Sequence, residues 1–302
     1  MIVVLIAATA ASACTREPIR TTAKTPELAP DALWFGGDVH FGVSARSGLG
    51  DIAPSLAGAV GIVNLEGLIS RSAGGSGRSG GDLWLRNPSD APAKLRSLGV
   101  AVASIHNNHR EDFGVQELAD TMILLKDAGI ESANRPSRLS VGPSPYTLIA
   151  ADLLTPNTAE LLSSALDTST GSLRIVSLHV TGPASYLPRP ELIAAVDAAV
   201  AHGANIVVAH GTHVIGPVER RGNTVIAWGL GNLFFDCECT TEDEAVILRV
   251  SLGPGHPAQV IPIRAGLGGR DANLHEDPAG VFDLLQALNS SPLTRGARAA
   301  EF

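Results

Sequence analysis

Basic side chains are scarce in this sequence, and they are nowhere gathered into a patch. The chain has 22 Lys and Arg residues against 30 Asp and Glu residues, which gives a formal net charge of −8. Neutralising the phosphates of a nucleic acid takes clustered Lys and Arg. The charge balance therefore argues against a nucleic-acid partner, and we expect none.

Aromatic residues are also few, at 4% of the chain, while Ala, Val, Leu and Gly are abundant. Small and aliphatic side chains suit tightly packed α/β layers. No internal repeat stands out, which gives no sign of a repeat architecture. A chain of 302 residues can bury a substantial core, and apart from its two ends it reads as one large domain.

A long apolar run is missing too, and the apolar segment Met1–Ala13 is too short for an ordinary transmembrane helix. Small residues precede Cys14, as in a peptidase cleavage site. We expect residues 1–14 to be a secretory signal of the bacterial lipoprotein kind, with Cys14 lipidated, and residues 15–31 to be a flexible tether. The protein would then be extracytoplasmic and anchored in the membrane through Cys14. A plain cleaved signal, giving a secreted protein, and a misassigned start are the alternatives.

Residues 104–114 carry two amides, two imidazoles and two carboxylates within a few positions. They follow an apolar run, Val100–Ile105, and precede a segment with helical periodicity, Val115–Ala128. Sheets in α/β proteins place their chemistry where a parallel strand ends and a helix begins. The pattern therefore predicts a functional site here.

Within that segment, Asn108 can offer an amide oxygen to a metal ion. His109 is free to act on a substrate as an acid or as an electrostatic stabiliser, and Asp112 can orient it by accepting its second ring proton. His106 and Asn107 fit a structural role, in which their side chains satisfy backbone groups.

Two earlier strand ends carry further ligand-type side chains. The strand at residues 32–35 is followed by Asp38 and His40, and alternation along an extended segment would put both on one side, where they can reach one cation. Glu66 follows the apolar run 60–63 and could bridge two metals or complete one coordination sphere. Taken alone, the Asp38 and His40 pair would instead be a solvated carboxylate beside a core histidine.

Two later predicted buried strands end in histidine: residues 174–178 deliver His179, and residues 205–209 deliver His210 and, after Gly211, His213. A single strand-end histidine is usually a hydrogen-bonded core residue, but in this company each becomes a candidate metal ligand. Asn232 follows a glycine-rich stretch and could hold a ligand histidine or a phosphate-like group.

Cys237 and Cys239 are separated by one residue, and such a pair seldom closes a disulfide because the ring is strained. A zinc site would need partners that the sequence does not identify. We expect the two cysteines to be free or paired with another chain, and we assign them no role.

The strand-end motifs, taken together and in order, resemble those of the CapA-type capsule synthesis family, which is associated with poly-γ-glutamate and related to calcineurin-like metallophosphatases. They are Gly37-Asp38-Val39-His40, Asn64-Leu65-Glu66, Asn107-Asn108-His109 with Asp112 and Gly114, Ser177-Leu178-His179, the stretch His210–Glu219, and Leu230-Gly231-Asn232. The resemblance implies a metallophosphatase-like α/β sandwich of two sheets flanked by helices. It covers about residues 32–265, so we expect residues 266–302 to be a C-terminal tail with a short helix.

The resemblance also implies a ligand set for one or two divalent ions such as Mn, Fe or Zn. The implied ligands are Asp38, His40, Glu66, Asn108, His179 and His213, with His109 as the catalytic histidine and Asp112 at the acidic position after it. Many members of the family have a further histidine where this chain has Gly211, so one ligand is either missing here or supplied by His210.

The motifs favour a metal-dependent hydrolase that acts on an anionic polymer or a phosphoester. The bond could be a phosphoester or the γ-glutamyl amide of a capsule polymer, and fold analogy alone does not choose between them. The alternative is a non-enzymatic component that binds or exports polymer with capsule-assembly membrane proteins and keeps a vestigial or structural metal site. A third explanation, histidines and carboxylates scattered through a core, fits poorly with so many strand-end placements.

Overall fold

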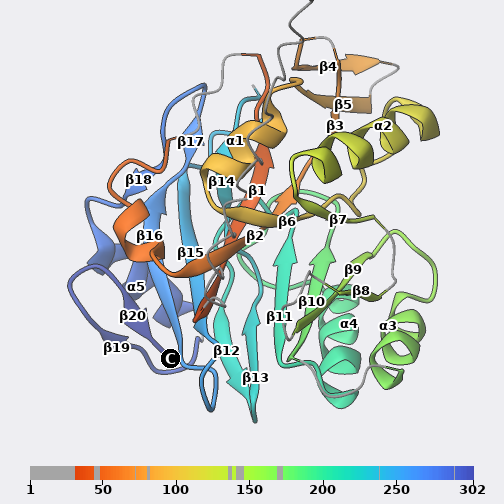
Figure 1. Ribbon diagram of the computed structural model, residues 1–302. Helices are drawn as coiled ribbons and strands as arrows, with labels where there is room; N and C mark the ends of the chain where they lie inside the picture. The colour runs from red at the N-terminus through yellow and green to blue at the C-terminus, as the bar shows by residue number, and fades with distance from the viewer. Residues whose placement is uncertain are drawn as a thin grey trace, which may run out of the picture.

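The computed structural model describes residues 31–43, 48–71, 73–79, 82–134, 138–140, 146–168, 173–237, 239–288 and 290–302. Two sheets pack face to face, and helices cover their outer faces (Figure 1). The expected α/β sandwich of two sheets flanked by helices is therefore confirmed.

The larger sheet has eleven strands among the described residues. Its main path runs in the order β19, β20, β16, β15, β1, β2, β6, β7, while β14 pairs with β1 and β17, and β18 pairs with β16. The strands are β1 (Ala32–His40), β2 (Ala59–Leu65), β6 (Val100–Ser104), β7 (Glu131–Ala133), β14 (Asn232–Phe235), β15 (Glu244–Ser251), β16 (Ala258–Arg264), β17 (Gly266–Leu267), β18 (Asn273–Leu274), β19 (Thr294–Arg295) and β20 (Ala300–Glu301).

The second sheet has the strand order β12, β13, β11, β10, β9, β8. Its strands are β8 (Arg138–Ser140), β9 (Tyr146–Asp152), β10 (Leu173–His179), β11 (Ile206–His210), β12 (Val218–Arg221) and β13 (Thr224–Ala227). A small third sheet consists of β3 (Leu68–Ile69), β5 (Asp82–Asn87) and β4 (Gly75–Ser79), in that order.

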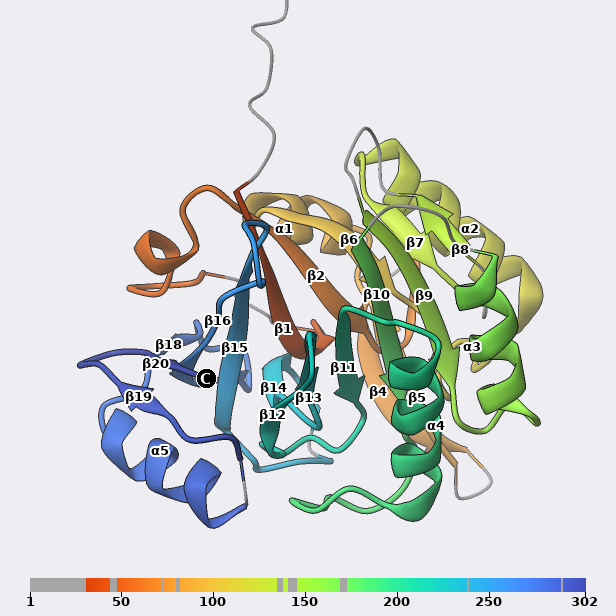
Figure 2. The same ribbon diagram turned by 90° about the horizontal axis from the view of Figure 1, so that it is seen from below.

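The helices are α1 (Ala91–Ser97), α2 (Gly114–Asp127), α3 (Thr158–Asp167), α4 (Pro190–Ala201) and α5 (Pro278–Ala287), and a 3-10 helix spans Ala53–Leu56. Helix α4 begins with proline at its first position, where the missing N–H costs no hydrogen bond. Helix α2 ends before Gly129, whose φ of 72° is the left-handed conformation expected after a helix end. In Figure 2, α5 lies apart from the other helices, beside β19 and β20.

The main core lies between the two large sheets. Phe35 and Ile62 of the larger sheet belong to one buried cluster with Ile175 and Val208 of the second sheet. Strand β1 is buried along its whole length because both its faces are covered, which explains its nearly continuous apolar sequence. Helices α1 and α2 cover the outer face of the larger sheet, and α3 and α4 cover that of the second sheet.

Most predicted strands and helices are present, but the segment between residues 140 and 172 showed too little periodicity for a prediction. It contains β9 and α3, and β9 pairs in parallel with β10. Residues after Ala265 contain α5, the expected short helix, together with short strands that pair with β14 and β16.

The expected signal and tether, with Cys14, lie outside the described residues. Among the helices that the structure describes, none has the length and apolar character needed to cross a membrane.

Candidate metal centre

The larger sheet brings two carboxylates to one place. Strands β1 and β2 run in parallel with Asp38 opposite Asn64, and Glu66 follows directly after β2. Asp38 and Glu66 are each only 1% exposed. Two carboxylates this deeply buried need cationic partners or hydrogen-bond donors, because an uncompensated buried charge is costly.

The second sheet brings histidines to the same place. His179 ends β10 and His210 ends β11, and the two residues face each other across that parallel pair. His213 follows three residues later with a φ of 58°, a left-handed conformation that a non-glycine residue seldom adopts. Such backbone conformations persist where surrounding structure holds them, and they are common at functional sites.

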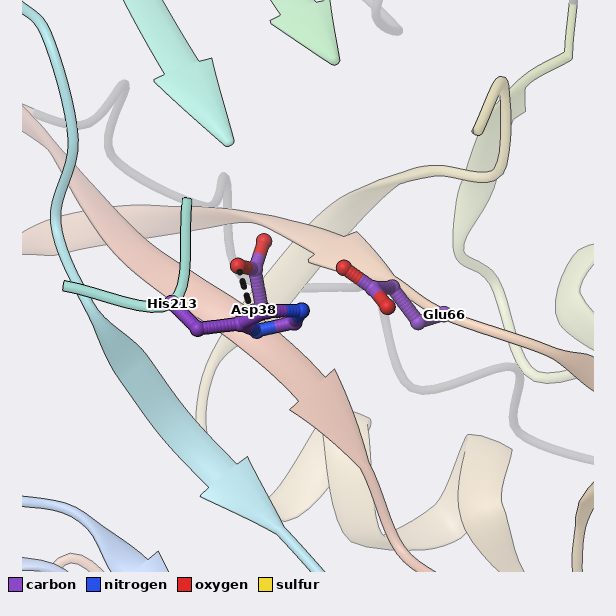
Figure 3. A group of neighbouring side chains, drawn as sticks. All are labelled: Asp38, Glu66 and His213. Atoms are coloured by element: carbon purple, nitrogen blue, oxygen red, sulfur yellow. Dashed lines mark ion pairs between the residues drawn. The ribbon is translucent and has the colours of Figure 1, made fainter. Parts of the chain in front are cut away.

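Asp38, Glu66 and His213 each offer a ligand atom, and these atoms all lie within 4.8 Å of one another. Figure 3 shows the Glu66 carboxylate pointing toward the Asp38 and His213 pair. His213 Nδ1 lies 3.3 Å from Asp38 Oδ2, and His210 Nδ1 lies 3.6 Å from Asp38 Oδ1. His179 Nε2 lies 3.4 Å from Glu66 Oε1. Three of the expected ligands thus form one compact group, with two more histidines at its edge.

Gly211 supports this group through its backbone. Its N–H donates to both carboxylate oxygens of Asp38, at 3.2 and 3.0 Å. Its φ is 82°, and a Cβ atom at this position would lie 2.6 Å from His179 Nε2 and would collide with the carbonyl oxygen of Val180. In this chain, therefore, a side chain cannot replace Gly211 without displacing His179.

Burial raises the pKa of Asp38, but the nearby side chains of His210 and His213 outweigh burial and hold that pKa well below its ordinary value. Burial also raises the pKa of Glu66, yet the charge of His213 brings it below its ordinary value. Both carboxylates are therefore ionised at neutral pH.

The histidines respond in the opposite direction. Burial lowers the pKa of His213, but the charges of Glu66 and Asp38 outweigh burial and raise it to about 10. Burial likewise lowers the pKa of His179, while Asp152 and Glu66 raise it to about 9. Without a metal ion, then, protonated imidazoles balance the carboxylates, and a divalent cation would take over that role by displacing protons.

The donor set fits a divalent cation. Carboxylate oxygens with imidazole nitrogens suit Mn, Fe or Zn. His210 Nδ1 is buried and has no hydrogen-bond partner among the described residues, as expected for a ring nitrogen kept for an ion. Within the described ranges, no other group of His, Cys, Asp and Glu side chains meets the same distance condition.

The remaining predicted ligands lie outside this group. His40 is completely buried and packs its ring 5.6 Å from that of Phe235. The register of β1 against β14 shifts between Asp38 and Val39 because β14 contains the extra residue, Leu233, so the shift leaves the alternation of β1 from Asp38 to His40 intact. Asn232 Oδ1 lies 2.9 Å from His213 Nδ1. This contact corresponds to the first of the two roles considered for Asn232, that of holding a ligand histidine.

A cavity of about 570 Å³ opens beside the metal centre. It is lined by Glu66, Asp82, Leu83, Asn108, His109, Glu111, Asp112, His179, Thr181, Gly182, Gly211 and His213. His109 Nδ1 lies 2.8 Å from Asp112 Oδ2, as expected for an orienting carboxylate. The other nitrogen of His109 is left for a substrate, and Asn108, which the sequence predicts to be a ligand, also lines the cavity.

Sequence reasoning missed Asp152. It ends β9 opposite His179, and its Oδ1 lies 3.9 Å from His179 Nδ1. The signal was present, because an apolar run, residues 148–151, precedes a carboxylate in the same way as at the other strand ends. The expectation for the cysteines was wrong: Cys237 and Cys239 form a disulfide with each other, since their Cα atoms lie 5.1 Å apart, within the usual range for a disulfide.

The fold and the site define a class: an α/β protein of two packed sheets with a carboxylate and imidazole centre at the strand ends. The chain matches the family model described as bacterial capsule synthesis protein PGA_cap over residues 13–134 and 140–237. This match covers most of the chain, so the protein belongs to the PGA_cap family, as the motifs indicated.

Two curated relatives and one solved structure are similar to this chain. The chain is 25% identical over 191 residues to probable polyglutamine synthesis accessory proteins of two strains of Mycobacterium tuberculosis. Each match covers 50% of this chain and 49% of the relative, so the chain spans about half the length of these curated relatives. A crystal structure of a hypothetical protein from Thermus thermophilus superposes with a TM-score of 0.51 at 16% identity, covering 76% of this chain and 97% of that one, which supports the fold alone.

Proposed function

We propose that this capsule synthesis family member is a metal-dependent hydrolase. The observation that carries the proposal is the convergence of Asp38, Glu66 and His213 on one point beside a cavity whose wall holds the paired His109 and Asp112. Ligand groups and an oriented imidazole at a single cavity are the parts that metal-assisted hydrolysis requires.

Each residue has a defined role in this proposal. Asp38, Glu66 and His213 hold the cation, and His179 and His210 are placed to complete its coordination. When bound, the cation supplies Lewis acidity, which polarises the scissile group and makes water a better nucleophile. His109 donates a proton to the leaving group, and Asp112 fixes its ring and tautomer.

The substrate that we propose is a phosphoester or a γ-glutamyl amide of an anionic polymer. The family description names capsule synthesis, and the names of the mycobacterial relatives refer to polyglutamine synthesis, which together support a place in the metabolism of a capsule or glutamyl polymer. No Lys or Arg lines the described part of the cavity, and Asp82 and Glu111 lie at its wall. An anionic substrate would therefore be held through the cation rather than through basic side chains.

We further propose that the protein acts outside the cytoplasm. The apolar segment Met1–Ala13 before Cys14 supports export and lipidation. A protein held at the membrane in this way would be positioned to work with capsule-assembly membrane proteins. Incorporation of labelled palmitate that is lost in Cys14→Ser is the expected result. An unlabelled wild-type protein would contradict the lipoprotein assignment.

A second candidate function is non-enzymatic polymer binding with a structural metal site. It is favoured by the charge balance of the centre, where protonated His179 and His213 neutralise the carboxylates without any cation. In that case, the fold would hold the site together whether or not an ion binds.

Hydrolysis assays separate the two functions. The purified protein, stripped of metal and then supplied with Mn²⁺, is assayed on a chromogenic phosphodiester and on γ-glutamyl amides of defined length. The hydrolase proposal expects turnover that needs Mn²⁺ and is lost in His109→Ala. Bound Mn²⁺ with no turnover on either substrate class would favour the binding role.

A further inference from the structure

The two carboxylates of the metal centre share one hydrogen-bond donor. The side-chain NH₂ of Asn64 donates to Asp38 Oδ1 at 2.9 Å and to Glu66 Oε1 at 3.2 Å. Asn64 is fully buried, so no solvent molecule competes for these contacts. One amide thus spans both carboxylates and sets the distance between them.

A second buried amide fixes the orientation of the first. Asn107 donates from its NH₂ group to Asn64 Oδ1 at 3.1 Å and to the carbonyl oxygen of Leu65 at 2.9 Å. The oxygen of Asn107 accepts from the backbone N–H of His109 at 3.1 Å. A backbone carbonyl can only accept and a backbone N–H can only donate. These two groups therefore determine which side-chain atom of Asn107 is the nitrogen and which is the oxygen.

The orientation of Asn64 follows from this. Because the NH₂ group of Asn107 faces Asn64, the atom of Asn64 that receives it must be oxygen. The opposite atom, which faces Asp38 and Glu66, is then the NH₂ group. If Asn64 were rotated by 180°, its oxygen would face two carboxylates and its NH₂ group would face a donor. Each amide therefore has one satisfied orientation.

We propose that Asn64 and Asn107 form a positioning pair that holds the two metal-binding carboxylates in place and ties them to the loop carrying His109. The proposal rests on the proposed metal-dependent function, and it assigns roles to two residues that touch neither the cation nor the substrate. Asn64 acts directly on the carboxylates, and Asn107 acts through Asn64. Outer groups that orient metal ligands typically change metal affinity by roughly 10- to 100-fold when they are removed.

The test uses four variants: Asn64→Leu, Asn107→Ala, the double variant, and Thr121→Val as a matched control. Thr121 is also fully buried, and its hydroxyl hydrogen-bonds the backbone of Ile69, away from the centre. Calorimetric titration with Mn²⁺ is expected to show affinity about 10- to 100-fold weaker for Asn64→Leu and about tenfold weaker, at the low end of that range, for Asn107→Ala. Thr121→Val is expected to lose stability but to bind Mn²⁺ as the wild type does.

The double variant is the sharpest part of the test. Since Asn107 acts through Asn64, the double variant is expected to bind Mn²⁺ no more weakly than Asn64→Leu alone. Effects that multiply in the double variant, or an Asn64→Leu protein with wild-type affinity, would overturn the proposal. If Asn64→Leu does not fold, the Mn²⁺ affinities of Asn107→Ala and Thr121→Val still test the proposal. Equal affinities in those two proteins would overturn it.

A second readout needs no metal. In the metal-free, ¹⁵N-labelled protein, the side-chain NH₂ signals of Asn64 are expected to shift in Asn107→Ala and to stay in place in Thr121→Val. Unchanged Asn64 signals in Asn107→Ala would refute the positioning pair. A wild-type protein that binds no Mn²⁺ while these signals do shift would instead refute the proposed metal-dependent function.

Discussion

The two sheets contribute different chemistry to one site. The larger sheet and the segments that follow its strands supply carboxylates and amides, namely Asp38, Asn64, Glu66, Asn107 and Asn232. The six-stranded sheet supplies imidazoles and a backbone donor, namely His179, His210, His213 and Gly211. One half is rich in negative charge and acceptors, and the other is rich in groups that are cationic or able to donate.

Neither half forms a stable site alone. Asp38 and Glu66 repel each other, and the charges that offset this repulsion come from the histidines of the other sheet. The centre therefore depends on the apolar layer between the sheets, where Phe35 and Ile175 belong to the same buried cluster. The site therefore depends on how the two sheets pack, so a substitution in the part of the site carried by one sheet should also affect the part carried by the other.

The largest effect is expected from Asp38→Asn, which removes the charge that both His210 and His213 approach. Mn²⁺ affinity should fall by more than about 100-fold, beyond the range for outer groups, and hydrolysis should disappear. Calorimetric titration measures the affinity. If Asp38→Asn bound Mn²⁺ as tightly as the wild type, Asp38 would not be a ligand.

His109→Ala should separate catalysis from metal binding. His109 contacts Asp112 rather than the ligand group, so the variant should bind Mn²⁺ as the wild type does. Loss of a general acid should lower kcat by about 10²- to 10⁴-fold. Steady-state kinetics and a metal titration of the same variant measure the two effects. Full activity of His109→Ala would show that His109 has no role in the mechanism.

Gly211→Ala tests the backbone support that the second sheet gives to the first. The new Cβ would meet His179 Nε2 at 2.6 Å, and φ is 82°. We expect a loss of about 2–4 kcal/mol in the free energy of unfolding together with weaker Mn²⁺ binding. Gly222→Ala is the control, because Gly222 has a φ of 59° but nothing within 4 Å of its added Cβ. Equal losses of unfolding free energy in Gly211→Ala and Gly222→Ala would mean that backbone strain alone accounts for the effect.

Metal affinity and metal-free stability should change in opposite directions with pH. The pKa values of His213 and His179 are raised to about 10 and about 9, so a cation must displace their protons, and Mn²⁺ affinity should rise with pH by up to about tenfold per unit for each proton released. The stability that these protonated histidines give the metal-free protein is complete below about pH 6.5 and is lost as pH rises through about 9 to 10. Chemical denaturation and metal titration from about pH 6 to about pH 10 measure both, and an affinity independent of pH would contradict histidine ligation.

A smaller effect is expected from Asp152→Asn. Its Oδ1 is 3.9 Å from His179 Nδ1, which is longer than a hydrogen bond. We expect Mn²⁺ affinity to fall by about tenfold, at the low end for an orienting group. Asp167→Asn is the matched control, because Asp167 also pairs with a histidine, His202, but at the surface. If the two variants behave alike, Asp152 has no role in orienting His179.

The placement of most site residues at strand ends could be predicted from the sequence, because parallel strands that share a sheet bring their carboxyl ends to one edge. Asp38, Glu66, His179, His210 and His213 all follow apolar runs, so the sequence already places them at such ends. The family resemblance then gave the order of motifs, and the fold class followed from both.

Other features depend on contacts that have no local signature. His40 follows Asp38 in the same strand but is not in the group of ligand atoms within 4.8 Å of one another, and only the side-chain positions reveal this. The amide chain from Asn107 to Asn64 joins residues 43 positions apart. Asp152 was hidden because the segment around β9 is weakly periodic, and the cysteine disulfide contradicted a rule based on ring size alone.

If carboxylates from one sheet and imidazoles from the other hold a cation together, the purified protein should retain metal. Elemental analysis after saturation with Mn²⁺ and removal of unbound metal should give at least one ion per chain in the wild type and none in Asp38→Asn. A wild-type protein that retains no metal, or an Asp38→Asn protein that retains as much as the wild type, would contradict this shared coordination.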